Sequence, residues 1–71
     1  MEINLNNTYS IILPTYNEVG NIQNIVKRIY DVLKEINFKI LFVDDNSSDG
    51  TIERIHQIKK EYKFVDLIQP I

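Results

Sequence analysis

The sequence is poor in cysteine and glycine: it contains no cysteine, and Gly20 and Gly50 are its only glycines. Without cysteine the chain can form no disulfide, no thiolate metal site and no thiol nucleophile. With two isolated glycines it lacks both the G-x-G-x-x-G turn and the P-loop, the glycine-rich loops that usually cradle phosphates in βαβ proteins. If a nucleotide binds, its phosphates therefore need another partner, most simply a divalent metal ion.

Positive charge and long apolar runs are also missing. The net charge is −2 and the isoelectric point is near 5.2, whereas a nucleic-acid-binding domain is expected to show a basic face. No apolar run approaches the roughly 18 residues needed to span a bilayer, and the first residues lack the basic and apolar regions of a signal peptide. The sequence therefore predicts a cytoplasmic protein that binds no nucleic acid.

The length of 71 residues allows one small domain at most. A domain of this size buries only about 60% of the surface of its unfolded chain, so it is marginally stable by itself. A small chain without disulfides is more easily understood as a piece of something larger. We therefore interpret residues 1–71 as a partial domain.

Three apolar runs predict β-strands. They cover residues 9–13, 38–43 and 64–68, and Pro14 ends the first of them. Continuous apolar runs of this length are typical of parallel strands that are buried on both faces.

Two segments between these runs predict amphipathic helices. Apolar residues recur at helical spacing over 22–36 and again over 52–62, which places them on one face of each helix. Asn21 and Thr51 precede these patterns and are the expected N-terminal caps. The resulting βαβαβ order predicts an α/β fold with right-handed crossovers and a parallel sheet. Three strands with only two helices leave apolar surface uncovered, so we expect the chain to need a further segment or a partner.

The first two strands end abruptly in polar residues. Tyr16 and Glu18 follow the first strand, and the adjacent carboxylates Asp44 and Asp45 follow the second. In open α/β sheets, ligands bind just beyond the carboxyl ends of parallel strands. By position alone an ordinary loop explains these residues equally well, with Glu18 beside a helix N-terminus and Asp45 as a turn or capping carboxylate. Two adjacent carboxylates repel each other unless a positive or hydrogen-bonding group meets them, which favours a binding site.

One alternative is a signalling domain. Residues 39–46 resemble the first strand of a two-component receiver domain, in which paired acidic residues hold Mg²⁺ beside a phosphorylated aspartate. A receiver domain begins with that strand, whereas here a complete βα unit precedes it, and residues 64–68 match the phospho-acceptor strand only loosely. The receiver-like interpretation is therefore the weaker one.

Taken together, the two strand ends resemble those of family 2 of the nucleotide-sugar glycosyltransferases, which have the GT-A fold. The matching segments are residues 12–18, Asn21 with Ile22, and residues 43–51. The likeness covers nearly the whole chain and is greatest to the dolichyl-phosphate mannosyltransferases and other polyprenyl-phosphate glycosyltransferases. It implies that residues 1–71 form the N-terminal, nucleotide-binding half of a Rossmann-like GT-A domain.

The resemblance also implies roles for individual residues. Pro14 and Tyr16 would pack on or beside the base and ribose of the nucleotide, and Glu18 would contact the nucleotide. Val43 would line the base pocket, and Asp45 would accept a hydrogen bond from the base. These five residues form the predicted nucleotide-sugar site.

For the parent enzyme the resemblance implies transfer of mannose or glucose from a GDP- or UDP-sugar to a polyprenyl (dolichyl-type) phosphate, at the cytosolic face of a membrane. Mg²⁺ or Mn²⁺ would neutralise the leaving diphosphate. In the family a D-x-D motif further along holds this metal, and the sequence has no D-x-D. No metal ligand or catalytic residue is therefore assigned here, and the chain alone is expected to be inactive. Asp44 is left open between a contact with the nucleotide and a brace of the loop. A truncated, non-catalytic remnant is the alternative.

Overall fold

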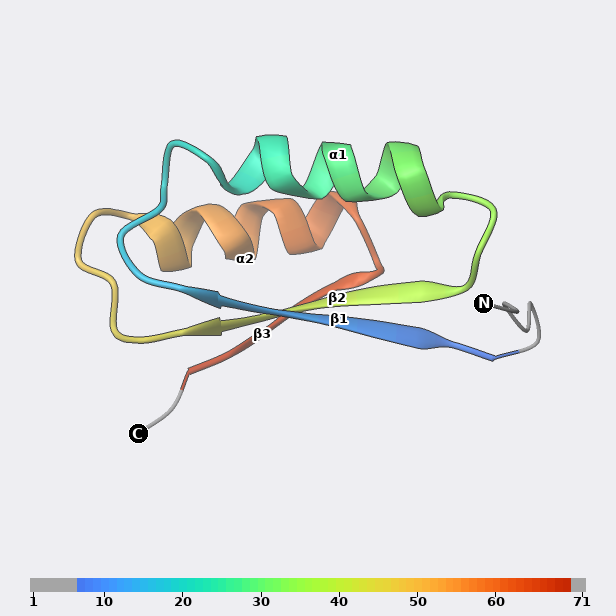
Figure 1. The fold of residues 1–71 in the computed structure, drawn as a ribbon. Coiled ribbons are helices and arrows are strands. Elements are labelled where there is room, and N and C mark those ends of the chain that lie inside the picture. The colour runs from blue at the N-terminus through green and yellow to red at the C-terminus, as the bar shows by residue number, and fades with distance from the viewer. Residues whose placement is uncertain (1–6, 70–71) are drawn as a thin grey trace.

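The computed structural model describes residues 7–69, which form three strands and two helices in the order βαβαβ (Figure 1). The elements are β1 (Tyr9–Thr15), α1 (Ile22–Leu33), β2 (Phe38–Asp44), α2 (Thr51–Glu61) and β3 (Val65–Ile68). The α/β order predicted from the apolar runs is confirmed, with element ends that differ from the prediction by three residues at most.

The three strands form one parallel sheet in the order β1-β2-β3. The β1–β2 register pairs Tyr9 with Phe38 at one end and Thr15 with Asp44 at the other. Both helices lie on the same face of this sheet (Figure 1). Because the strands are parallel, the connections that leave β1 and β2 emerge at the same edge of the sheet.

The hydrophobic core lies between the sheet and the two helices. Every element except β1 contributes at least one fully buried apolar side chain to it: Ile22, Val26, Ile40, Phe42, Ile55, Ile58 and Val65. The helical residues of this set recur at the spacing that places them on one face, and those of β2 alternate as the pleat requires. The core therefore follows directly from the two periodicities in the sequence.

The prediction that the first strand is buried on both faces and ends at Pro14 is wrong. β1 is an edge strand, and Ile12 is 63% exposed because no helix covers its side of the sheet. Pro14 lies within the strand, paired with Val43. Proline is tolerated there because an edge strand has one side on which no ladder hydrogen bond is required.

The sheet face opposite the helices is largely apolar. Strand alternation places Ile12, Pro14, Leu41, Val43 and Ile68 on it. Ile68 is 49% exposed. Among the described residues nothing covers this face, so the predicted uncovered apolar surface is confirmed.

The two predicted helix caps behave differently from the prediction. Asn21 does occupy the N-cap position of α1, but its side chain makes no capping hydrogen bond. Thr51 is not a cap: it is the first residue of α2, and the N-cap is Gly50. Gly50 has a φ of 97°, in the left-handed region that favours glycine. The carboxylate of Asp49 accepts the Thr51 N–H at 3.0 Å and so takes over the capping role.

Aromatic packing closes the end of the molecule opposite the β1–α1 and β2–α2 loops. Phe64 stands at the centre, with its ring centroid 4.8 Å from that of Phe38, 5.4 Å from that of Tyr62 and 5.9 Å from that of Tyr30. Aromatic pairs at such separations add to the stability gained from burial alone. This packing therefore joins α1 and β2 to the segment that connects α2 to β3.

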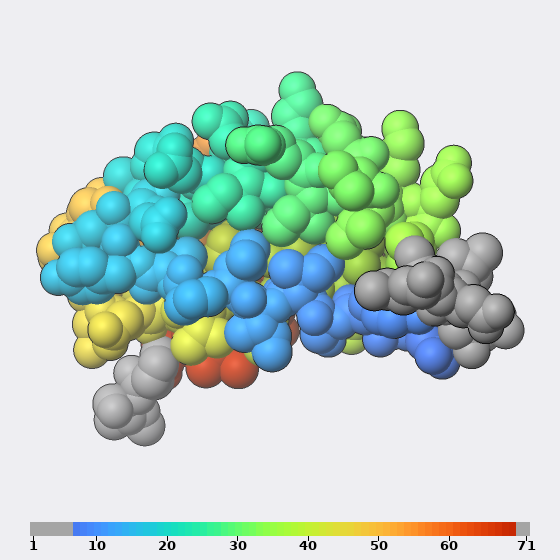
Figure 2. All heavy atoms as spheres, viewed as in Figure 1, coloured from blue at the N-terminus to red at the C-terminus, as the bar shows by residue number. Residues whose placement is uncertain are grey.

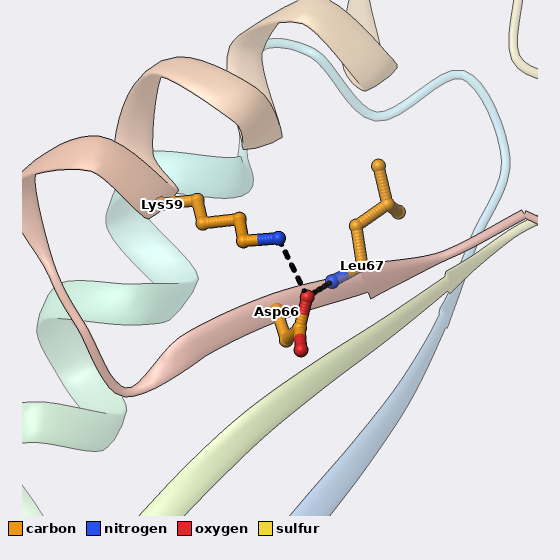
Figure 3. A network of polar contacts seen from close by, with 3 residues as sticks. All are labelled: Lys59, Asp66 and Leu67. Atoms are coloured by element: carbon orange, nitrogen blue, oxygen red, sulfur yellow. Dashed lines mark hydrogen bonds and ion pairs between the residues drawn. The ribbon is translucent and has the colours of Figure 1, made fainter.

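An ion pair joins α2 to β3 on the surface. Lys59 Nζ lies 2.9 Å from Asp66 Oδ1, and the same oxygen accepts the Leu67 N–H at 2.8 Å (Figure 3). The hydrogen bond from Lys59, followed by that from Leu67, lowers the pKa of Asp66. Both side chains of the pair are about half exposed or more, so water and salt screen the pair and it adds little to stability.

Candidate functional site

Two loops meet at the carboxyl edge of the sheet. Residues 16–21 connect β1 to α1, and residues 45–50 connect β2 to α2. They lie against each other at one end of the molecule, the first in cyan and the second in yellow (Figures 1 and 2). The register places them there, because Thr15 and Asp44 are paired at the strand ends and the Asp45 N–H donates to the Thr15 carbonyl at 3.0 Å.

The carboxylate of Asp44 lies at the centre of this junction and is 0% exposed. Its Oδ1 accepts hydrogen bonds from Thr15 Oγ1 at 2.8 Å and from Ser47 Oγ at 2.6 Å. Its Oδ2 accepts the Ser47 N–H at 2.8 Å. Among residues 7–69 no positive side chain forms an ion pair with it. Three hydrogen-bond donors therefore replace water around a buried charge.

The pKa of Asp44 reports the balance of these contacts. Burial raises the pKa, and the negative charge of Asp49 raises it further. The hydrogen bonds from the Ser47 side chain and backbone and from the Thr15 hydroxyl act in the opposite direction and outweigh both, so the pKa is lowered from 3.8. Asp44 is therefore ionised at neutral pH despite its burial.

Asn17 adds a second set of contacts between the loops. Its backbone N–H donates to Ser47 Oγ at 2.8 Å, and its side-chain Oδ1 accepts the Ser48 N–H at 2.9 Å. Asn17 and Asn46 both adopt positive φ, 50° and 56°. Asparagine is enriched in this left-handed region because its short polar side chain can bond locally. The two asparagines thus allow the sharp turns that bring the loops together.

Asp49 and Thr51 form a third set. Thr51 Oγ1 accepts the Glu18 N–H at 2.8 Å and donates to Asp49, while Asp49 Oδ2 accepts the Val19 N–H at 3.2 Å. The hydrogen bond from the Thr51 side chain is the main cause that lowers the pKa of Asp49. The start of α2 is therefore bonded to the residues that lead into α1.

The structure brings the five predicted nucleotide-contacting residues to this one edge. Pro14 and Val43 are direct partners in the β1–β2 ladder. Tyr16, 61% exposed, and Asp45, also exposed, come next along their strands. Glu18 is half-buried, and its backbone is used by Thr51 and Asn21. The contacts of all five with a nucleotide remain predictions.

Sequence reasoning missed the residues that join the loops: Thr15, Asn17, Ser47 and Thr51. The prediction that adjacent carboxylates need hydrogen-bonding partners is met by two of them, since Thr15 and Ser47 donate three bonds to Asp44. The signal left unused was the alternation of side-chain direction at the end of β2. It turns Asp44 towards the helices and Asp45 to the other side, so that one carboxylate is buried and the other exposed.

The described residues do not fit a metal ion. Within residues 7–69 no group of three or more histidine, aspartate or glutamate side chains is placed to hold one. Asp44 has both oxygens occupied by hydrogen bonds.

An α/β fold with exposed polar and aromatic side chains at the carboxyl ends of parallel strands has the arrangement in which open α/β sheets bind their ligands. Residues 10–69 match the glycosyl transferase family 2, and the chain belongs to this family. Family membership decides against the receiver-like alternative.

Curated relatives agree with this assignment. The chain is 40% identical over 53 residues to a dolichol-phosphate mannosyltransferase of Pyrococcus furiosus, a match that covers 75% of this chain and 15% of that protein. It is 37% identical over 60 residues to the uncharacterised glycosyltransferase YkcC of Bacillus subtilis, covering 82% of this chain and 17% of that protein. The chain therefore spans less than a fifth of these two relatives.

A solved structure supports the GT-A fold. A mannosyltransferase from Pyrobaculum calidifontis, in complex with GDP-Man and Mn²⁺, superposes with a TM-score of 0.67 at 25% sequence identity. The match covers 87% of this chain and 18% of that one.

We predict that the buried carboxylate makes stability depend on pH. Because the pKa of Asp44 is lower in the folded state, its contribution is present above about pH 4 and is lost as the pH falls through the folded value. Chemical denaturation of the parent and of Asp44→Asn should therefore differ more at about pH 7 than at about pH 3. An equal difference in unfolding free energy at both pH values would show that the charge of Asp44 does not stabilise the folded state.

Proposed function

We propose that this chain forms the nucleotide-recognition wall of a glycosyltransferase that uses a nucleotide-sugar donor. The observation that carries this proposal is the contrast between two adjacent carboxylates. Asp44 is buried and fully hydrogen-bonded, whereas Asp45 is exposed beside Tyr16 at the carboxyl edge of the sheet. An exposed carboxylate and an exposed aromatic ring at this edge suit recognition of a planar base.

Each predicted residue has a physical role in this proposal. The ring of Tyr16 stacks on the base or ribose, while Pro14 and Val43 supply an apolar surface beneath it. Asp45 accepts a hydrogen bond from an imino or amino group of the base. Glu18 contacts the nucleotide from the loop that leads into α1.

The donor is a GDP- or UDP-sugar, and the transferred sugar is mannose or glucose. Support comes from the relative named as a dolichol-phosphate mannosyltransferase and from the similar mannosyltransferase solved with GDP-Man and Mn²⁺. On the same basis the acceptor is a polyprenyl phosphate, and transfer takes place at the cytosolic face of a membrane. No helix within residues 7–69 is long and apolar enough to cross a membrane.

The enzyme uses a divalent metal, Mg²⁺ or Mn²⁺, and support comes from the similar mannosyltransferase solved with Mn²⁺; among residues 7–69 we assign no ligand to it. We likewise assign no catalytic residue to these 71 residues. The part played by this chain is recognition of the nucleotide.

We predict that Asp45→Ala weakens binding of GDP or UDP, whichever the unsubstituted protein binds more tightly, by about tenfold or more. A hydrogen bond to a charged group contributes about 1.5–3 kcal/mol, and about 1.4 kcal/mol is tenfold in affinity. Isothermal titration calorimetry of the intact protein measures this change.

Asp31→Ala is the matched control. Asp31 is an exposed aspartate of α1, away from the two loops, so this variant removes the same charge and should bind like the parent. Equal affinities of Asp45→Ala and the parent would remove Asp45 from the site. Equal losses in both variants would show a general effect of net charge.

The parent enzyme that contains this chain is also predicted to transfer labelled sugar from GDP-mannose or UDP-glucose to a polyprenyl phosphate. This transfer should stop when EDTA removes the divalent metal. Extraction of the labelled lipid product measures the transfer. Binding of nucleotide without any transfer to this acceptor, with Mg²⁺ or Mn²⁺ present, would favour the non-catalytic remnant.

A further inference from the structure

We propose that Asp44 is a positioning residue that holds the two loops in one arrangement, so that Tyr16 and Asp45 face the same nucleotide. That a nucleotide binds here rests on the proposed function. The contacts of Asp44 with Thr15 and Ser47, called the clamp below, are seen in the structure and do not depend on it.

The chemistry at this point requires a carboxylate for more than packing. An apolar side chain would fill the same buried space without the cost of removing a charge from water. What a carboxylate adds is the capacity to accept several hydrogen bonds at once. Asp44 uses it to bind the last residue of β1, through Thr15 Oγ1, and the loop after β2, through the side chain and backbone of Ser47.

Ser47 passes this constraint to the other loop. Its hydroxyl donates to Asp44 Oδ1, which leaves its oxygen free to accept the Asn17 N–H, at 2.8 Å. Asn17 in turn accepts the Ser48 N–H. The backbone N–H of Asn17 can only donate, so Ser47 accepts from it while giving its single hydroxyl proton to Asp44. Loss of the charge at Asp44 is therefore felt at Asn17, which Asp44 does not contact.

Two exposed residues of the proposed site, Tyr16 and Asp45, are the sequence neighbours of Thr15 and Asp44. Tyr16 follows Thr15, and Asp45 follows Asp44. The backbone bond from Asp45 to Thr15 crosses the same junction. A change in the contact between Thr15 and Asp44 thus moves both exposed side chains relative to each other.

Asp44 does not itself contact the nucleotide in this arrangement. It is completely buried, and its three hydrogen bonds occupy both oxygens. The neighbouring contacts of Asp49 bond Val19 and Thr51 and involve neither Asp44 nor Ser47. The arrangement of Tyr16 and Asp45 therefore depends first on Asp44.

The first test is amide hydrogen exchange in the intact protein, parent against Asp44→Asn. Asparagine keeps the shape of the side chain but places an NH₂ group against donors that need an acceptor. We expect the Asn17 and Ser48 amides, neither of which contacts Asp44, to exchange at least about tenfold faster relative to the core amide of Ile40. An unchanged ratio would overturn the clamp, whatever the protein binds.

The second test measures affinity for GDP and UDP. Asp44→Asn should weaken binding of the preferred nucleotide by at least about tenfold under conditions where the variant stays folded. Ile58→Val, a core variant that lowers stability, is the control and should leave the affinity of the folded protein unchanged. If Asp44→Asn loses no more affinity than Ile58→Val, Asp44 has no positioning role.

Thr15 supplies a conservative comparison. Thr15→Ser keeps the hydroxyl that donates to Asp44, whereas Thr15→Val removes it at nearly constant volume, so only the valine variant should repeat the loss seen with Asp44→Asn. Equal affinity in both would contradict the role of this hydrogen bond. If the parent binds neither GDP nor UDP while the exchange result holds, the proposed function fails and the clamp stands.

Discussion

At the carboxyl ends of its strands, the fold of this chain depends on one buried charge. Asp44 sits at the end of the central strand, removed from water, and three donors from two segments compensate for that removal. Burial of a carboxylate without such donors costs several kcal/mol. The ends of β1 and β2 and the loop after β2 are therefore not independent, since each supplies something that the charge needs.

The two ends of the molecule are held together by different interactions. At one end aromatic rings around Phe64 join α1 and β2 to the segment that connects α2 to β3 through apolar contact. At the other end directional hydrogen bonds join the two loops. Hydrogen bonds fix geometry more closely than apolar packing does, because they depend on angle as well as distance. The proposed contacts of Tyr16 and Asp45 with a nucleotide would benefit from this fixed geometry.

Much of the fold could be predicted from the sequence because its signals are periodic. Ile22 and Val26 recur at helical spacing and lie in the core, and Ile40 and Phe42 alternate and do the same. The errors fall where tertiary context overrides a local rule. Pro14 suggested the end of a strand, but it lies inside one because β1 is at the edge of the sheet.

The candidate site could be predicted only in part, and for a related reason. Motif resemblance selected Tyr16 and Asp45, but the contacts that join the two loops are between residues 29 to 33 positions apart in sequence. Local patterns carry no information about such pairs. Thr51 illustrates this: by local sequence it is a helix cap, whereas in the structure its hydroxyl accepts the Glu18 N–H.

The most direct test of the account is a nuclear magnetic resonance titration of the isotopically labelled protein with GDP and with UDP. The account predicts that the amide signals of Tyr16 and Asp45 shift in a saturable manner with one of the two nucleotides, while the signal of Phe64 at the opposite end does not move. Saturable shifts centred on the aromatic end, or no shift with either nucleotide, would contradict it.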